Sequence, residues 1–112
     1  MTTEIHGKMQ FTSIQLQDAP KVPFNLDGKI MHTSNKLELV HLTLKPGEKI
    51  GKHPQPFDVV FYILSGIAIL ETDTEEIEVK ENTSIFVPAG IQRGWNNTGP
   101  ADFKLLVIKD LA

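Results

Sequence analysis

The sequence contains no cysteine. Disulfides, thiolate zinc sites and cysteine nucleophiles are therefore excluded, and any bound metal must be held by nitrogen or oxygen donors. The net charge is −3 and no basic run occurs, which argues against binding nucleic acid through its phosphates. No apolar run approaches the roughly 20 residues that cross a bilayer. The start, Met1 to Glu4, has neither a basic segment nor an apolar continuation, so we expect a cytoplasmic protein without a secretory signal.

The size and composition are those of an ordinary globular domain. The chain has 112 residues, of which 40% are hydrophobic and 22% charged, enough for one apolar core. We therefore expect a single domain over residues 1–112. The first eight residues are expected to be loose or to contact a second copy of the chain.

The hydropathy pattern predicts short strands separated by turn residues, without an amphipathic helix. The pair Asp27-Gly28 indicates a hairpin turn. The segment Glu76 to Lys80 alternates strictly, which is typical of an outer or edge strand. Short strands at intervals of about ten residues, with glycine and proline turns between them, predict an all-β sandwich or barrel. Strands are expected over residues 9–17, 36–44, 57–64, 67–70, 76–80, 84–87 and 103–108.

The segment after the strand at 36–44 contains a motif of residues at fixed spacing that begins and ends with a glycine. Gly47 is followed by five residues and then His53, and Gln55 stands two positions further on. Val59 and the closing Gly66 complete the set.

A second set lies near the C-terminus. Pro88 and Gly90 flank one residue, Arg93 follows after two more, and Asn97 stands four positions beyond it.

Together the two sets resemble the signature motifs of the cupin superfamily, Gly-x5-His-x-His-x3–4-Glu-x6-Gly and Pro-x-Gly-x2-His-x3-Asn. The resemblance covers about residues 35–108 and implies a double-stranded β-helix, the jelly roll or cupin barrel. The family's metal is held by three histidines and one glutamate. Only His53 remains at its position, because Gln55, Val59 and Arg93 replace the other three ligands. The metal site is therefore expected to be largely lost.

Three glycines of these motifs stand where the strands must turn tightly. We expect Gly47, Gly66 and Gly90 to adopt positive φ, which glycine tolerates.

The resemblance implies that the motif residues surround the barrel mouth. Phe61 and Trp95 share strand parity with Val59 and Arg93, so they are expected to line the same cavity. The candidate ligand-binding residues are therefore His53, Gln55, Val59, Phe61, Arg93, Trp95 and Asn97.

Arg93 has two possible roles. Facing the cavity, its guanidinium would repel a divalent cation and could bind a carboxylate or phosphate with two hydrogen bonds. Facing outward, it would pair with a surface acid.

The other candidates also have alternatives. His53 is a metal ligand, a general base or an idle remnant of an ancestral site. Gln55 offers its amide to a metal or a ligand, or is only a polar residue at the mouth. Val59 is either an apolar cavity wall or a core valine, and Trp95 either stacks on a planar ligand or belongs to the core.

Two functions remain open at this level. The first is a cupin-like protein that binds a small, anionic molecule without a cofactor. The second is a metal-dependent enzyme of dioxygenase, isomerase or decarboxylase type, in which His53 and Gln55 hold a divalent ion with non-motif donors such as His32 or His41.

Small cupins commonly form dimers, so the resemblance also implies a homodimer. The apolar N-terminal strand around Phe11, Ile14 and Leu16 is the candidate contact.

Overall fold

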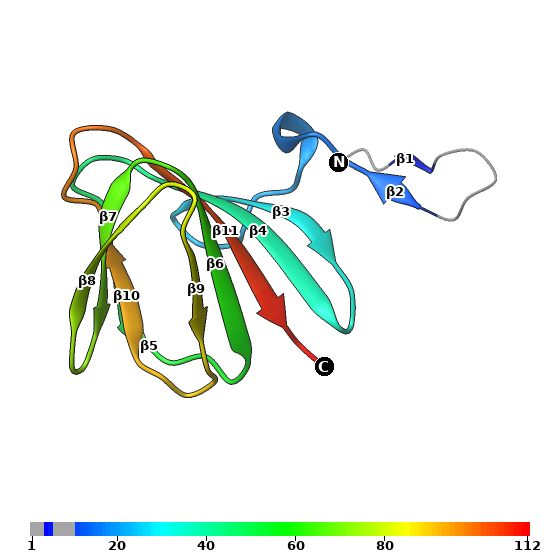
Figure 1. Cartoon of the computed structure of the whole chain (residues 1–112). Helices are drawn as coiled ribbons and strands as arrows, with labels where there is room; N and C mark the ends of the chain where they lie inside the picture. Colours follow the sequence, from blue (N-terminus) through cyan, green and yellow to red (C-terminus); the bar gives the residue numbers. More distant parts are fainter. Residues whose placement is uncertain (1–3, 6–10) are drawn as a thin grey trace.

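The computed structural model describes residues 4–5 and 11–112, and its body consists of two antiparallel sheets that face each other (Figure 1). The larger sheet has the order β3-β4-β11-β6-β9 and the smaller one β5-β10-β7-β8. All strand pairs are antiparallel. The prediction of an all-β double-stranded β-helix is therefore confirmed. No helix of the described segments is long and apolar enough to cross a membrane.

The strands are short, as the turn residues predict. In the larger sheet they are β3 (Asp27–Thr33), β4 (Leu37–Leu44), β11 (Phe103–Asp110), β6 (Asp58–Ser65) and β9 (Ser84–Val87). In the smaller sheet they are β5 (Lys49–His53), β10 (Arg93–Asn96), β7 (Ile67–Thr72) and β8 (Glu76–Lys80). Before them, β1 (Glu4–Ile5) pairs with β2 (Thr12–Ser13), and a 3-10 turn, η1 (Leu16–Asp18), follows.

The strictly alternating segment forms β8, the edge strand of the smaller sheet, as predicted. The predicted strand over residues 9–17 is wrong for the described part, where only Thr12–Ser13 is a strand and η1 interrupts the extended chain. Thr12 and Ser13 pair with β1 in a separate two-stranded sheet. The expectation for residues 1–8 falls mostly outside the described residues.

The predicted hairpin at Asp27-Gly28 is also wrong, because these residues begin β3 and pair with Thr43 and Leu42 of β4. Gly28 is needed for close packing and not for a turn. A Cβ at this position would lie 2.9 Å from Cγ2 of Val22, whose amide donates to the Gly28 carbonyl at 2.9 Å.

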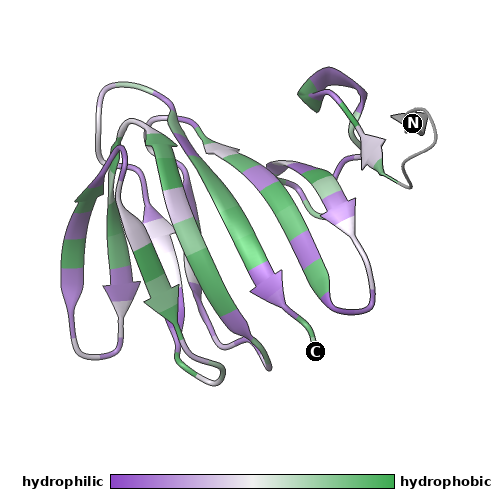
Figure 2. Cartoon of the chain, turned by 45° about the vertical axis from the view of Figure 1, so that its right-hand side comes forward, coloured by the Kyte–Doolittle hydropathy of each residue, from purple (hydrophilic) through white to green (hydrophobic). Residues whose placement is uncertain are grey.

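The core fills the space between the two sheets. Alternate residues of β11, Phe103, Leu105 and Val107, point inward, and Phe103 and Leu105 are fully buried. Figure 2 shows the apolar residues along the central strands of the larger sheet, with hydrophilic residues at the C-terminal end of β11.

The predicted glycine conformations are confirmed. Gly47, Gly66 and Gly90 have φ values of 85°, 89° and 84°. At Gly66 a Cβ would also lie 2.5 Å from the carbonyl oxygen of Asp102, so a larger residue there would have to displace backbone.

Candidate functional site

A cavity of about 150 Å³ lies between the two sheets. Its wall is mostly apolar, and its polar groups come chiefly from β5, β10 and the end of β11. The residues that line it are Val22, Phe24, Leu26, Val40, Leu42, Ile50, His53, Gln55, Phe61, Arg93, Gly94, Trp95, Val107 and Lys109.

Arg93 points into this cavity from β10, so it does not swing outward to a surface acid. The residue is only 4% exposed, and its Cζ lies 6.0 Å from the centroid of the Phe61 ring. The Nη1 atom is buried and finds no hydrogen-bond partner among the described residues. Burial lowers the pKa of Arg93 from its ordinary value, but a guanidinium remains protonated in proteins. The cavity wall therefore carries a buried positive charge with an unused donor.

Trp95 stands two residues further along the same strand and is 2% exposed. Its ring meets Phe61 edge-on, with centroids 5.3 Å apart, and packs at 5.1 Å against Phe103. Trp95 is thus both a core residue and a cavity wall. Its indole Nε1–H is a second buried donor without a partner among the described residues, although buried indole groups usually find an acceptor.

His53 is exposed on the edge strand β5, directly opposite Arg93 in the sheet register. Its Nδ1 lies 2.9 Å from the carbonyl oxygen of Gly51. Because a carbonyl can only accept, Nδ1 carries the proton in this bond, and Nε2 of the neutral ring keeps its lone pair. Nε2 is therefore the atom of His53 that is available to accept a proton or to coordinate.

The two predicted motifs meet through their backbones. The amide of Gly90 donates to the carbonyl of the half-buried Gln55 at 2.8 Å. The amide of Gly47 likewise donates to the carbonyl of Asn97 at 2.9 Å. These bonds hold β5 and β10 together at both ends and so fix His53 beside Arg93.

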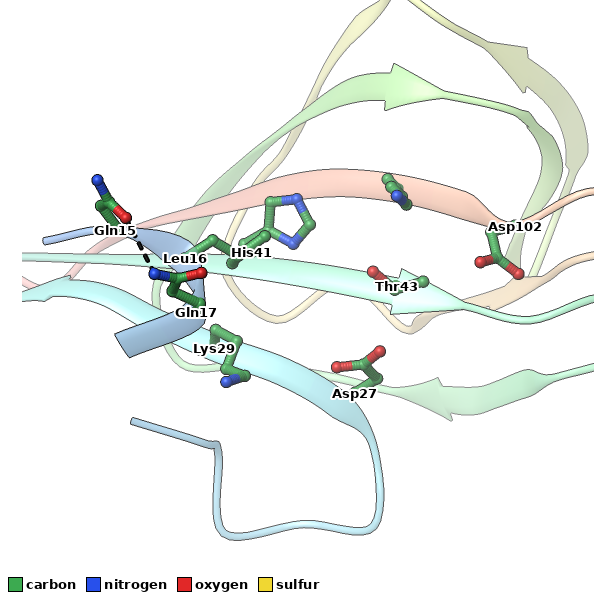
Figure 3. Close-up of a pocket in the computed structure, with 9 residues that line it drawn as sticks. Gln15, Leu16, Gln17, Asp27, Lys29, His41, Thr43 and Asp102 are labelled. Atoms are coloured by element: carbon green, nitrogen blue, oxygen red, sulfur yellow. Dashed lines mark hydrogen bonds between the residues drawn. The ribbon is translucent and has the colours of Figure 1, made fainter. Parts of the chain in front are cut away.

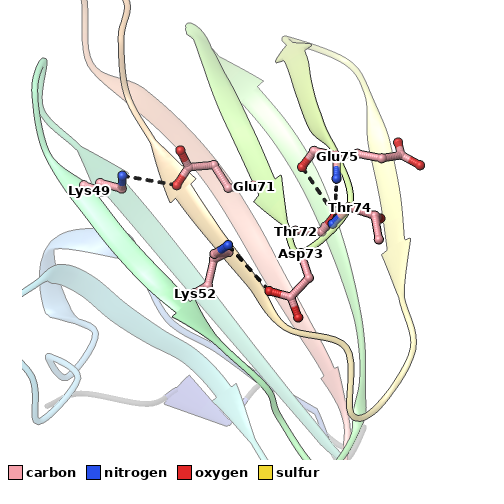
Figure 4. Close-up of polar contacts among 7 residues, drawn as sticks. All are labelled: Lys49, Lys52, Glu71, Thr72, Asp73, Thr74 and Glu75. Atoms are coloured by element: carbon pink, nitrogen blue, oxygen red, sulfur yellow. Dashed lines mark hydrogen bonds and ion pairs between the residues drawn. The ribbon is translucent and has the colours of Figure 1, made fainter.

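Gly94 lets β5 approach β10 closely. A Cβ there would lie 2.3 Å from the carbonyl oxygen of Ile50, so no side chain fits without moving backbone. On the outside of the sheet, Lys49 of β5 pairs with Glu71 of β7 at 3.4 Å, and Lys52 pairs with Asp73 at 3.5 Å (Figure 4). The more exposed pair, Lys52 with Asp73, contributes at most about 1 kcal/mol, and both pairs join the edge strand to β7 or the turn after it, across β10.

Lys109 is a cavity residue that the sequence reasoning missed. Its Nζ donates to Glu38 at 3.1 Å and lies 5.7 Å from the centroid of the Phe57 ring. Lys109 shares strand parity with the buried Phe103 and Leu105, which was the signal that could have identified it.

Two predicted site residues do not line the cavity. Val59 is 1% exposed and belongs to the apolar core. Asn97 has no exposed surface, and its Nδ2 donates to the carbonyls of Leu44 at 2.9 Å and Ala101 at 3.0 Å. Its Oδ1 accepts from the amide of Gly99 at 3.0 Å. These three bonds use both ends of the side-chain amide. Asn97 therefore closes a loop, and this structural role explains why it stands at this position of the motif.

His41 and His32, the non-motif histidines considered as metal donors, also lie elsewhere. His41 lines a groove on the outside of the larger sheet, with Lys29 and Asp27 (Figure 3). Burial and the charge of Lys104 lower the pKa of His41, and Asp27 raises it by less. His32 lines a third hollow, next to residues 12–14.

The fold and cavity define a jelly-roll protein with a small site between its sheets. The chain belongs to the cupin family, because the model of the cupin domain matches residues 40–109.

Several known proteins are similar to it. The tetracenomycin polyketide synthase protein TcmJ of Streptomyces glaucescens is 31% identical over 62 residues. That match covers 54% of this chain and 42% of the relative, so the chain spans less than half of that relative's length. The polyketide cyclase RemF of Streptomyces resistomycificus has a TM-score of 0.78 at 15% identity, over 88% of this chain and 78% of that one. A predicted oxalate decarboxylase of Thermotoga maritima has a TM-score of 0.80 at 18% identity, over 88% of this chain and 98% of that one. At these identities the two structures show a shared fold.

The cavity does not fit the metal centre that the family motifs imply. The described residues contain no cluster of three or more histidine, cysteine or carboxylate side chains that could hold a metal ion. The cavity offers only His53 and the amide of Gln55 as neutral donors, and Arg93 and Lys109 bring positive charge to the same wall. A divalent cation would meet repulsion there instead of the usual three or four ligands.

Proposed function

We propose that this protein binds a small molecule whose anionic group is held in the inter-sheet cavity by Arg93. The observation that carries the proposal is that two residues of one apolar cavity, Arg93 and Trp95, have buried donors, Nη1 and Nε1, without a partner in the described part of the chain. Leaving a buried donor unsatisfied costs about 1–3 kcal/mol, more for a charged group. A ligand that supplies acceptor oxygens to both atoms removes that cost, and a carboxylate fits a guanidinium best.

The rest of the cavity supports a compact ligand with an apolar body. Phe61 and Trp95 form a perpendicular aromatic wall, and Val40 and Leu42 line the cavity from β4. Pockets for drug-sized ligands measure about 300–1,000 Å³, so a cavity of about 150 Å³ suits a smaller molecule. Gln55 and His53 add an amide and an imidazole to the same wall.

A second candidate function is catalysis on such a ligand. The polyketide cyclase and predicted oxalate decarboxylase among the similar structures favour it, as does the free Nε2 of His53 opposite Arg93. In this version Arg93 fixes the acidic substrate and His53 acts as the general acid or base that transfers a proton. The metal-dependent version has weaker support, because His32 and His41 do not line this cavity.

The binding proposal is tested with Trp95, the only tryptophan of the chain, as its own reporter. Its fluorescence is titrated with benzoate and with benzamide, which have similar shapes but differ in charge. We expect saturable binding of benzoate, weaker binding of benzamide, and at least about a tenfold loss of benzoate affinity in Arg93→Met. Lys80→Met, which removes an exposed cation from β8, is the matched control and should bind like the wild type. Equal affinity for both compounds, or full benzoate binding by Arg93→Met, would contradict the proposal.

Whether the protein binds a metal ion is tested by measuring the metal content of protein purified without chelators or metal resin. We expect substoichiometric metal both in the wild type and in His53→Ala. Full occupancy in the wild type that is lost in His53→Ala would reject the metal-free site and favour the metalloenzyme. The cytoplasmic location predicted from the sequence remains part of the proposal, and cell fractionation tests it.

A further inference from the structure

The inter-sheet cavity is lined by two cationic side chains that come from opposite sheets, Arg93 from β10 and Lys109 from β11. No aspartate or glutamate stands among the lining residues that the structure describes. Taken alone, these two cations would suit a ligand with two negative charges. The partners of the two cations differ, however, and they decide how much charge the cavity presents to a ligand.

The charge of Lys109 is offset by an acid on the neighbouring strand. Glu38 of β4 is in register with Lys109, and its Oε1 accepts a hydrogen bond from Nζ at 3.1 Å. The other carboxylate oxygen, Oε2, accepts from Oγ1 of Thr33 at 3.4 Å. The side chains of Lys109 and Glu38 are 24% and 25% exposed, so solvent screens this pair less than a pair on the open surface. The pair as a whole therefore adds little net charge to the cavity.

Arg93 has no acid of this kind. Its buried Nη1 finds no hydrogen-bond partner in the described segments, and none of the ion pairs formed there includes it. Glu38 shares strand parity with Val40 and Leu42, which line the cavity on the larger sheet, so its carboxylate lies on the Lys109 side. The three charged groups together thus present a single net positive charge, at Arg93.

Building on the function proposed above, we infer that the cavity selects acids with one negative charge and that Glu38 sets this selectivity. A single carboxylate satisfies Arg93 and leaves the pair of Lys109 and Glu38 intact. A second carboxylate within reach of Lys109 would also approach Glu38, and like charges repel strongly in a desolvated cavity. A neutral oxygen avoids this repulsion and can accept from the remaining N–H donors of Lys109. The ligand class is therefore a small monocarboxylic acid, any second polar group of which is neutral.

Succinamate and succinate test the selectivity, because they share a carbon skeleton and differ only in an amide or a second carboxylate at one end. Binding is followed by the fluorescence of Trp95 at a pH where both carboxylates of succinate are ionised. We expect the wild type to bind succinamate at least about tenfold more tightly than succinate. In Glu38→Gln, which keeps the shape of the side chain and removes its charge, this ratio should fall at least about tenfold. Glu78→Gln, which removes an exposed acid from β8, is the matched control and should keep the wild-type ratio.

Variants of Lys109 separate the effect of charge from that of structure. Lys109→Met leaves the charge of Glu38 uncompensated, so it should weaken the binding of both acids, and of succinate more than of succinamate. The double variant Lys109→Met/Glu38→Gln has the net charge of the wild type and should return to the wild-type ratio. A purely structural pair would instead change both affinities by the same factor in every variant. Circular dichroism verifies that each variant folds.

The inference and the proposed function fail in different ways. Equal binding of the two acids by the wild type, an unchanged ratio in Glu38→Gln, or a double variant that does not return to the wild-type ratio would overturn the inference. Failure of both acids to bind where benzoate binds would overturn it as well. In each of these cases the proposed function stands as long as benzoate binding depends on Arg93. Benzoate binding that is absent, or unchanged in Arg93→Met, would reject the proposed function and this inference with it.

Discussion

Replacing Arg93 by methionine should make the empty protein more stable. In the wild type a guanidinium that is 4% exposed has an unpaired Nη1 and lies against an aromatic ring. Methionine keeps most of the length of the side chain, removes the charge and the unpaired donor, and adapts to irregular apolar space. The binding residue is thus predicted to carry a cost in folding stability.

The expected increase in the free energy of unfolding of Arg93→Met follows from two known ranges. An unsatisfied buried donor costs about 1–3 kcal/mol, and exchanging buried charges for apolar side chains has stabilised proteins by about 1–4 kcal/mol. Methionine fills less volume than arginine, which offsets part of this gain. We therefore expect the free energy of unfolding to rise by about 1–3 kcal/mol, with Tm higher by about 4 °C for each kcal/mol.

Urea denaturation followed by far-ultraviolet circular dichroism measures the effect without using Trp95. The midpoint should rise at an unchanged slope, which identifies a change in stability alone. A saturating anionic ligand should reduce the difference, because at a hundred times the wild-type Kd it stabilises the wild type by about 2.7 kcal/mol and a variant with tenfold weaker binding by only about 1.4 kcal/mol. Lys80→Met should stay within about 0.5 kcal/mol of the wild type. A destabilised Arg93→Met would refute the reasoning, since it would mean that the guanidinium is structural.

Three further predictions concern the stability of the fold. Asn97→Ala should lower the free energy of unfolding by about 2–4 kcal/mol in urea denaturation, because it leaves the buried carbonyl of Leu44 and the amide of Gly99 unpaired; a loss below about 0.5 kcal/mol would contradict this. Gly94→Ala should destabilise by at least about 1–3 kcal/mol and weaken ligand binding by displacing β5, whereas Gly51→Ala, whose Cβ meets nothing within 4 Å, should be tolerated in the same assays. The lowered pKa of His41 means that the unfolded chain takes up its proton first as the pH falls below 6.5, so stability should be full above that pH and decline below it. His41→Gln should lose less stability between pH 7 and pH 5, and an unchanged pH dependence would show that His41 does not contribute.

The sequence pattern predicted the strands that have a clear apolar face. β8 lies where strict alternation places it, β4 and β9 lie within the predicted strands at 36–44 and 84–87, and the positive φ of Gly47 followed from its place in the motif. β5 and β10 were missed because each is short and contains a glycine, Gly51 or Gly94, that interrupts the apolar pattern. These strands form because they pair with each other and β10 pairs with β7, which is information that no single segment contains.

The residues that line the cavity could be predicted where they lie on strands, because side chains alternate between the two faces of a strand. Phe61 and Trp95 line the cavity as parity indicated. Asn97 could not be placed in this way, because its side chain pairs with backbone of Leu44, which is far away in the sequence. The contribution of Val22 and Leu26 was not predictable either, because the segment before β3 crosses the cavity without a regular pattern.

The replacements at the motif positions are chemically consistent with one another. A carboxylate at Val59 would lie in the apolar core, where it would need a metal or a cation to stay charged. In the proposed metal-free site, the positive charge of the cavity wall comes from the protein itself, through Arg93 of β10. Unlike a bound metal ion, the guanidinium of Arg93 cannot leave the site, and it stays ionised when the cavity is empty. It follows that the empty site is strained in wild-type protein, and that ligand affinity and the stability of the empty fold should change in opposite directions when Arg93 is replaced.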